Sequence, residues 1–305
     1  MNDGYRRTVE LLLDIAPRVF AEPDFALKGG TAINLFVWDM PRLSVDLDVV
    51  FTPADVPRDD ALARIATALD RIRQALERSA GTTVRLAGAK GDEVKLQVER
   101  SGYRVTVEVN TVFRGTAYPV VSRALAPAAA DHFKRDVRIG VLDPDELFGS
   151  KLVAAMDRQH PRDLFDVMQL FDRGGITPRM RRAFVVYAAG HPRPIGELLT
   201  PNPQPLEQPY RTDFVGMTEH AVPLDRLLAT RDRLFRELPE SLDGDERRFL
   251  LSMKEGEPAW ALLDIPQVER LPALTWKLLN VRKLRDDHPE KHARMLSTLR
   301  AKLQL

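Results

Sequence analysis

The sequence predicts a bilobed α+β protein, in which a mixed β-sheet flanked by helices is followed by a mostly α-helical second half. Two observations support this class. Short β-branched runs separated by turn residues concentrate before residue 142, whereas later apolar residues recur at helical spacing between prolines. We therefore expect two domains, with the sheet in residues 1–142 and the helical domain in residues 143–305.

The turn residues and the spacing of apolar residues predict the elements of the first half in order. Pro23 ends the first helix and Gly81 closes the third, while Ser101-Gly102 joins two strands into a hairpin. A further turn is expected at 88–92. The expected helices are 5–20, 31–38 and 55–79, and the expected strands are 25–28, 45–51, 83–86, 93–99, 104–113 and 137–142.

Prolines and helix-start signals divide the second half. Asp143-Pro144-Asp145-Glu146 is a strong helix start, because proline and acidic residues favour the first turn. The proline-rich region 191–210 is interpreted as a linker or extended loop. The expected helices are 146–160, 162–173, 177–189, 223–237, 245–254, 259–263 and a pair over 271–303.

The composition excludes several classes of protein. The chain has 305 residues, 44% hydrophobic and 29% charged, as in ordinary globular proteins. A net charge of +1 gives no global field for nucleic acid, so any basic surface must be local. The absence of cysteine excludes disulfides, thiolate zinc sites and cysteine nucleophiles. No run reaches the ~20 apolar residues of a membrane helix and no signal peptide is recognisable, so we expect a soluble, cytoplasmic protein.

The first candidate site lies in residues 28–51, KGGTAINLFVWDMPRLSVDLDVVF. Gly29 and Gly30 let the backbone approach a phosphate, to which the following helix offers free N–H groups. Asp46 and Asp48 are two residues apart on a strand, so they point to the same face. Their repulsion is relieved by Mg²⁺, which takes one or two carboxylates together with substrate phosphates. Taken alone, the glycine pair could be a plain turn and the two aspartates a solvated strand edge. Taken together, the two motifs indicate phosphoryl or nucleotidyl transfer.

Three neighbouring residues are further candidates. Thr31 directly follows the glycine pair, and Ser44 precedes Asp46 by two residues. A local cap or turn bond is the favoured interpretation of Ser44. Its phosphorylation is a second hypothesis, since a phosphate adds about −1.5 to −2 charge beside the acids. Arg42 is within reach of the acids or of a phosphate, but is interpreted as a surface arginine.

A third acid is expected on the strand over 104–113. Its polar face carries Glu108 as the single acid. In two-metal phosphoryl transfer, a carboxylate on a neighbouring strand completes the metal site and accepts the proton of the attacking hydroxyl. We therefore predict Glu108 as a metal ligand, with a solvent-facing strand glutamate as the alternative.

The helical half carries a second group of candidates. Lys151 is a suitable point charge for a phosphate, and Arg158, two helical turns later, shares its face. Asp163 stands at a helix start, where an acid is ordinarily a cap. Arg158, Arg162 and Asp166 equally suit a structural cluster of ion pairs. Basic and aromatic residues at 179–187 and 276–285 suit either an RNA groove or solvated helix faces.

These motifs resemble those of a known family. Gly-Gly, a short helix and a strand with two aspartates are similar to the signature of the nucleotidyltransferase (polymerase-β-like) superfamily. The strings KGGTAINLF, RLSVDLDVVF, KLVAAMDRQHPRDLFDV and LPALTWKLLNVRKL resemble the AbiEii/AbiGii toxins, the nucleotidyltransferase-like (MenT-like) toxins of bacterial type IV toxin–antitoxin systems.

The resemblance implies a polymerase-β-like fold and an Mg²⁺-dependent transfer of NMP from an NTP to an acceptor hydroxyl. The expected acceptor is a tRNA 3′ end, whose blocking stops translation and growth, and the expected partner is an antitoxin encoded alongside, of a DNA-binding kind. The alternatives are transfer to a protein or small molecule, a kinase-like phosphotransfer, and an inactive binding module. The implied roles are catalysis by Asp46, Asp48, Lys151 and Asp163, binding of two Mg²⁺ by Asp46, Asp48 and Glu108, and nucleotide binding by Gly29, Gly30, Thr31, Ser44, Lys151 and Arg158.

Overall fold

The computed structural model describes residues 2–90 and 93–305, which form two compact units. Unit 1 extends to Leu147 and includes Phe214–Val222, and unit 2 consists of Phe148–Asp213 and Pro223–Leu305. The returning segment is joined to unit 1 by a backbone hydrogen bond of 2.8 Å from Leu43 N to Met217 O. None of the helices in the described ranges is both long and apolar enough to cross a membrane.

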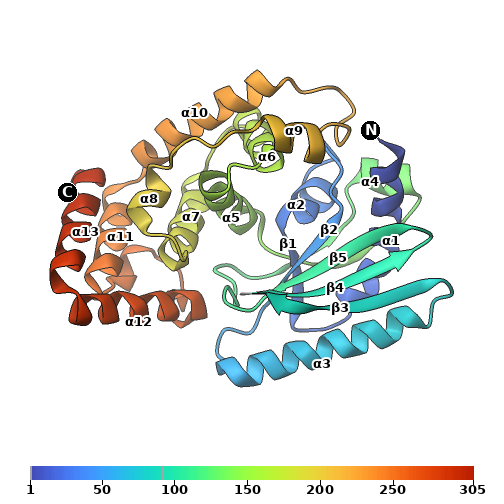
Figure 1. Cartoon of the computed structure of the whole chain (residues 1–305), viewed down its shortest axis with the longest axis horizontal. Helices are drawn as coiled ribbons and strands as arrows, with labels where there is room; N and C mark the ends of the chain where they lie inside the picture. The colour runs from blue at the N-terminus through green and yellow to red at the C-terminus, as the bar shows by residue number, and fades with distance from the viewer. Residues whose placement is uncertain (1, 91–92) are drawn as a thin grey trace. The chain divides into compact units, whose positions relative to one another are not determined.

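A mixed sheet organises unit 1, and its described residues form seven strands in the order β3-β4-β5-β2-β1-β7-β6. Figure 1 labels the first five of these strands. The pairs β2–β5 and β1–β7 are parallel, and the other neighbours are antiparallel. The predicted α+β class is confirmed, and β6 is an additional strand. The strands are β1 (Phe25–Lys28), β2 (Asp46–Phe51), β3 (Thr82–Lys90), β4 (Glu93–Arg100), β5 (Tyr103–Asn110), β6 (Val121–Ala124) and β7 (Arg138–Val141).

The two faces of the central strands differ in polarity. Leu47 of β2 and Val107 of β5 are fully buried. The helix α1 (Asp3–Val19) contacts β2 and β5, and α3 (Arg58–Glu77) packs against β3. Because strand residues alternate between faces, the residues between these apolar ones form a polar surface that carries the acids of β2 and β5. The core therefore holds the acidic strand in place without covering its carboxylates.

The short elements around the strands follow the expected chain order, with two changes. Helical structure begins at Gly29, not Thr31, as α2 (Gly29–Ala32) followed by the π-helical η1 (Ile33–Val37). A helix that was not predicted, α4 (Pro127–Phe133), follows β6. The predicted hairpin is present, and Ser101 and Gly102 both have positive φ, as in two-residue hairpin turns. The turn predicted at 88–92 lies partly outside the described residues, and β3 continues to Lys90.

Unit 2 is built from helices. The interpretation of 191–210 as a linker was wrong, because two helices, α8 (Ile195–Leu199) and α9 (Glu207–Asp213), begin within it. The other α-helices are α5 (Pro144–Asp157), whose first residues belong to unit 1, α6 (Pro161–Asp172), α7 (Pro178–Gly190), α10 (Leu224–Ser241), α11 (Gly244–Glu255), α12 (Pro272–Asp287) and α13 (Pro289–Lys302).

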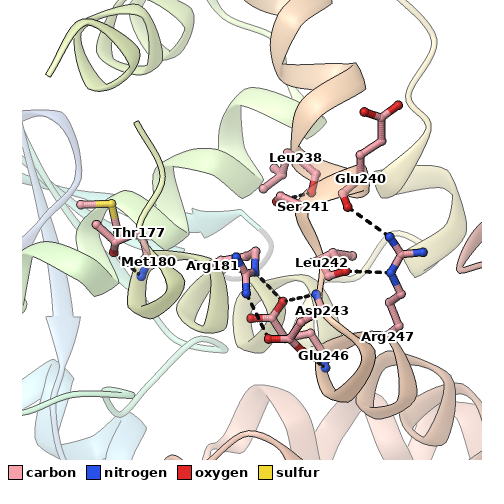
Figure 2. Close-up of polar contacts among 10 residues, drawn as sticks. All are labelled: Thr177, Met180, Arg181, Leu238, Glu240, Ser241, Leu242, Asp243, Glu246 and Arg247. Carbon is pink, nitrogen blue, oxygen red and sulfur yellow. Dashed lines mark hydrogen bonds and ion pairs between the residues drawn. The ribbon is translucent and has the colours of Figure 1, made fainter. Parts of the chain in front are cut away.

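An arginine joins α7 to the start of α11 (Figure 2). Arg181 donates from Nε to Glu246 at 2.6 Å and from Nη2 to Asp243 at 3.0 Å. Asp243 and Glu246 also form the capping box of α11. Burial by itself lowers the pKa of Arg181, but the hydrogen bonds and charges of Glu246 and Asp243 together outweigh it and raise the pKa above the ordinary value. Arg181 therefore joins two helices, a structural role that neither the RNA groove nor the solvated helix face predicted for 179–187 included.

A lysine of α12 closes the other end of α7. Lys277 donates from Nζ to the carbonyl oxygens of His191, Pro192 and Arg193, at 2.6, 3.2 and 3.0 Å. Burial, and then the charge of Lys254, lower the pKa of Lys277 to about 8. His191 is the C-cap of α7, and Pro192 and Arg193 follow it in the connection to α8, so this ammonium satisfies carbonyls that have no helical donor. Lys277, like Arg181, therefore links helices of unit 2 through its hydrogen bonds.

Candidate active site

The acidic strand and the glycine turn of unit 1 are packed against each other. Gly29 has a φ of +73°, and a Cβ on its backbone would lie 1.9 Å from Oδ2 of Asp48. Lys28, just before it on β1, is the register partner of Asp48 on β2. A side chain at position 29 would therefore displace the carboxylate. This contact explains physically why a glycine stands at the end of β1, opposite an aspartate.

The second glycine lies beside a buried arginine. A Cβ on Gly30 would lie 2.7 Å from Nη2 of Arg42 and 3.1 Å from Oγ of Ser44. Arg42 is 2% exposed, and its Nη1 donates to the carbonyl of Leu43 at 2.9 Å. The interpretation of Arg42 as a surface arginine was therefore wrong. Its guanidinium stands next to the candidate phosphate turn, where a planar, permanently charged group suits phosphate oxygens.

The hydroxyl groups of Thr31 and Ser44, both predicted to contact the nucleotide, lie next to the glycine turn. Thr31 is fully buried, and its Oγ1 donates to the carbonyl of Asp46 at 2.5 Å. Asn34 supports the same turn by donating from Nδ2 to the carbonyl of Gly30 at 2.9 Å. Ser44 is 6% exposed. The contact of Thr31 ties α2 to the first residue of β2, so its hydroxyl positions the acidic strand.

Four charged residues form one row across β1, β2, β5 and β4. Lys28 is in register with Asp48, Asp48 with Glu108, and Glu108 with Lys95. Nζ of Lys95 donates to Oε1 of Glu108 at 2.8 Å. The two side chains are only 34% and 25% exposed. The sheet thus places Asp48 beside Glu108, as expected for acids on neighbouring strands, and it also places a lysine that was not predicted on the far side of Glu108.

Two carboxylates on β2 are suited to holding a divalent cation without a third acidic ligand. Among the residues that the structure describes, no group of three or more His, Cys, Asp or Glu side chains is arranged to hold a metal ion. Asp46 and Asp48 nevertheless share one face of β2, and Mg²⁺ is commonly held by one or two carboxylates, with water and substrate phosphates as the other ligands. The carboxylate of Glu108 is engaged with Lys95. Its role as a third ligand stays a prediction.

Unit 2 contains a buried cluster of charges between α5 and α6. Nζ of Lys151 lies 2.8 Å from Oδ1 of Asp163 and 3.0 Å from Oδ2 of Asp166. The side chains of these three residues are 6%, 1% and 0% exposed. Arg158 donates from Nε and Nη2 to Asp163, at 2.6 and 3.0 Å. A buried lysine therefore faces two buried carboxylates, and a largely exposed arginine pairs with one of them from the surface.

The start of α6 fixes this cluster. His160 is the N-cap, and its Nδ1 accepts from the backbone N–H of Arg162 at 3.2 Å. This places Asp163 in the first turn. Burial alone would raise the pKa of Asp163, but Lys151 and then Arg158 outweigh it and hold that pKa well below its usual range. Asp163 is thus an anion that restrains Lys151, and Asp166 is a second restraint on the same ammonium.

The structure groups the predicted site residues into two sets. One set is in unit 1 and gains Arg42 and Lys95, which were not among the predicted site residues. The other is in unit 2 and gains Asp166. The first set is Gly29, Gly30, Thr31, Ser44, Asp46, Asp48 and Glu108, and the second is Lys151, Arg158 and Asp163.

The chain is similar to known proteins over most of its length. A family model described as nucleotidyl transferase AbiEii toxin, type IV TA system, matches residues 10–278. A search of curated proteins found no match. Among solved structures, the chain is similar to MenT4, a nucleotidyltransferase toxin from Mycobacterium tuberculosis H37Rv. The TM-score is 0.58 and the identity 20%, over 88% of this chain and 93% of that one. At this identity the likeness shows a common fold.

Proposed function

This chain belongs to the AbiEii family of nucleotidyl transferase toxins of type IV toxin–antitoxin systems, and from that premise we propose that it transfers NMP from an NTP to an acceptor hydroxyl with the help of Mg²⁺. The observation that carries the proposal is the contact between the carboxylate of Asp48 and the backbone of Gly29. It joins a candidate metal ligand to a candidate phosphate turn. A nucleotide triphosphate with its cation needs both at one place.

The glycine turn is the proposed binding place of the NTP phosphates. Because Gly29 and Gly30 have no Cβ, the Asp48 carboxylate and the Arg42 guanidinium stand directly against the turn. The guanidinium of Arg42 adds positive charge beside the turn and a fork of donors suited to phosphate oxygens. Ser44 lies beside the same guanidinium, so its hydroxyl is a second proposed donor.

The acids have the proposed task of arranging the transfer. Asp46 and Asp48 are the residues that would hold Mg²⁺, which supplies charge stabilisation at the phosphates when bound. The acceptor oxygen attacks the α-phosphorus, the bond from that phosphorus to the α–β bridging oxygen breaks, and pyrophosphate leaves. Glu108, on the strand next to Asp48, is proposed to accept the acceptor's proton or to hold a second cation.

Lys151 is proposed to neutralise the triphosphate, and Asp163 to hold Lys151 in position. The support is the resemblance of the string KLVAAMDRQHPRDLFDV to the family and the bond of 2.8 Å between the two side chains. To bind a phosphate, the Lys151 ammonium gives up one carboxylate oxygen and takes a phosphate oxygen in its place. One anionic partner thereby replaces another. Arg158, whose side chain is 63% exposed, is proposed to contact the same anion.

The proposed acceptor is the 3′ end of tRNA, in the cytoplasm. Blocking that hydroxyl prevents aminoacylation and so stops translation, which agrees with a family of toxins. The type IV system implies a cognate antitoxin, and we propose that it is encoded beside the toxin and is of a DNA-binding kind.

Labelled nucleotides test this proposal. Each α-labelled NTP is incubated with the full chain, Mg²⁺ and total RNA, and the products are separated on a gel. We expect a labelled band of tRNA size. Periodate oxidation of the RNA destroys the 3′-terminal diol, so the band should disappear in that control. Label in protein, or in RNA whose 3′ end is oxidised, would contradict the proposed acceptor.

A further inference from the structure

Lys95 lies where it opposes the binding of a cation to Glu108. We infer that its ammonium is a built-in competitor of the divalent cation for the Glu108 carboxylate, and so sets the cation concentration at which Glu108 becomes a ligand. The inference rests on the proposed function, because it takes Asp46 and Asp48 as the first ligands of that cation. In this view Lys95 lowers the affinity of the site for the cation, so that Glu108 becomes a ligand only at a higher cation concentration.

The geometry of the hairpin makes this ion pair part of the fold. Lys95 and Glu108 are directly opposite on β4 and β5, and their charged atoms are 2.8 Å apart. Ladder pairing on either side, from Val94↔Val109 to Leu96↔Val107, fixes both backbones. The lysine therefore remains near the carboxylate whether or not it is bonded to it. Because both side chains are only partly exposed, their attraction is screened less than that of a fully exposed pair.

The row of charges explains why the lysine and a cation exclude each other. Asp48 and Glu108 are neighbours in the β2–β5 register, so a cation shared between them would stand close to the ammonium of Lys95. Two positive charges at such a distance repel, and each lowers the affinity of the carboxylate for the other. Glu108 therefore exchanges Lys95 for the cation, and the free energy of the ion pair is subtracted from cation binding.

Manganese binding tests this inference without measuring activity. Mn²⁺, which takes similar oxygen ligands and is detected by EPR when free, is titrated into the nucleotide-free full chain. Replacing Lys95→Met should lower the dissociation constant about three- to tenfold, because the competing charge is gone while the aliphatic stem remains. Lys95→Arg, which keeps the charge, should bind Mn²⁺ as the wild type does. When Glu108→Gln is already present, adding Lys95→Met should not change the dissociation constant for Mn²⁺ further.

A matched control separates the ion pair from general charge. Lys134→Met removes the same charge in unit 1, at a lysine that is 76% exposed and paired with Asp131. It should leave Mn²⁺ affinity unchanged. An equal gain in both variants would overturn the inference, since a long-range field would then explain it. Circular dichroism and thermal unfolding verify the fold, and Lys95→Gln serves as a second neutral variant if the Met variant unfolds.

One further variant distinguishes this inference from the proposed function. Asp48→Asn should weaken Mn²⁺ binding strongly. If it does so while Lys95→Met and Lys95→Gln bind Mn²⁺ like the wild type, the competitor role is wrong and the metal site stands. If Asp48→Asn binds Mn²⁺ like the wild type, the proposed metal site itself is wrong, and the inference falls with it.

Discussion

The carboxylate of Asp48 touches the backbone of Gly29 so closely that a Cβ at position 29 would be 1.9 Å from Oδ2. This contact links the two motifs that carry the proposed chemistry. It also means that the position of the acid depends on the absence of a side chain on the neighbouring strand end. A mutation at the glycine therefore acts on the carboxylate.

Gly29→Ala should reduce nucleotide transfer about 100-fold, because displacing a catalytic group by about 1 Å has effects of this size. Gly81→Ala is the matched control: Gly81 also has a positive φ, +71°, but a Cβ there meets nothing within 4 Å. Both variants have the same backbone strain, roughly 1–2 kcal/mol. Transfer rates and urea unfolding are measured for both. Equal losses of activity would mean that strain, not the carboxylate, is responsible.

Asp163→Asn should destabilise the protein at neutral pH by about 3 kcal/mol, because Lys151 and Arg158 lose a buried partner. The effect should depend on pH. The folded pKa of Asp163 is depressed, so its stabilisation is present above the unfolded value of about 3.9 and is lost as pH falls toward the folded pKa. The difference between wild type and variant in urea unfolding should therefore shrink below about pH 4.

The control for this pH series is Asp172→Asn. Asp172 ends the same helix, its side chain is 54% exposed, and its contact with Arg226 is 3.7 Å, so its replacement should change the unfolding free energy little at any pH. A gap between wild type and Asp163→Asn that stayed constant from pH 7 to pH 3 would contradict the assignment of Asp163 as a strongly stabilised anion.

Lys277→Met should lower the unfolding free energy by about 1–3 kcal/mol, because three carbonyl groups of the connection that follows α7 lose their donor. Lys283→Met, an exposed lysine of the same helix, should change it by less than about 0.5 kcal/mol. Chemical unfolding of both variants is the measurement. If Lys277→Met were as stable as wild type but bound RNA more weakly, the lysine would be a nucleic-acid contact instead of a cap.

One site residue that was not predicted, Lys95, could have been predicted from the sequence. The hairpin turn at Ser101-Gly102 was predicted, and a two-residue turn fixes the register of the strands that it joins. Outward from Arg100↔Tyr103, five steps bring Lys95 opposite Glu108. Lys95 follows from the predicted turn and the predicted acid by counting alone. The contact of Gly29 with Asp48 needed more, since the pairing of β1 with β2 spans a connection whose length fixes no register.

Other features depended on tertiary packing that no local pattern encodes. Arg42 lies in an irregular segment, and nothing in its neighbours distinguishes an arginine buried against Gly30 from one in solvent. The prolines at 191–210 suggested a linker because proline interrupts helices. Pro194 and Pro209, however, stand at the N-cap of α8 and in the first turn of α9, where no N–H is needed. The two short helices were missed for that reason.

The central claim is that the face of β2 that bears Asp46 and Asp48 catalyses nucleotidyl transfer. It is tested most directly by incubating total RNA and Mg²⁺ with one NTP labelled either at the α- or at the γ-phosphate, using the wild type and Asp46→Asn. We predict that only the α-label enters RNA, that pyrophosphate is released, and that the folded Asp46→Asn variant transfers neither label. Transfer of the γ-label with release of nucleoside diphosphate, or full activity of the folded variant, would contradict the claim.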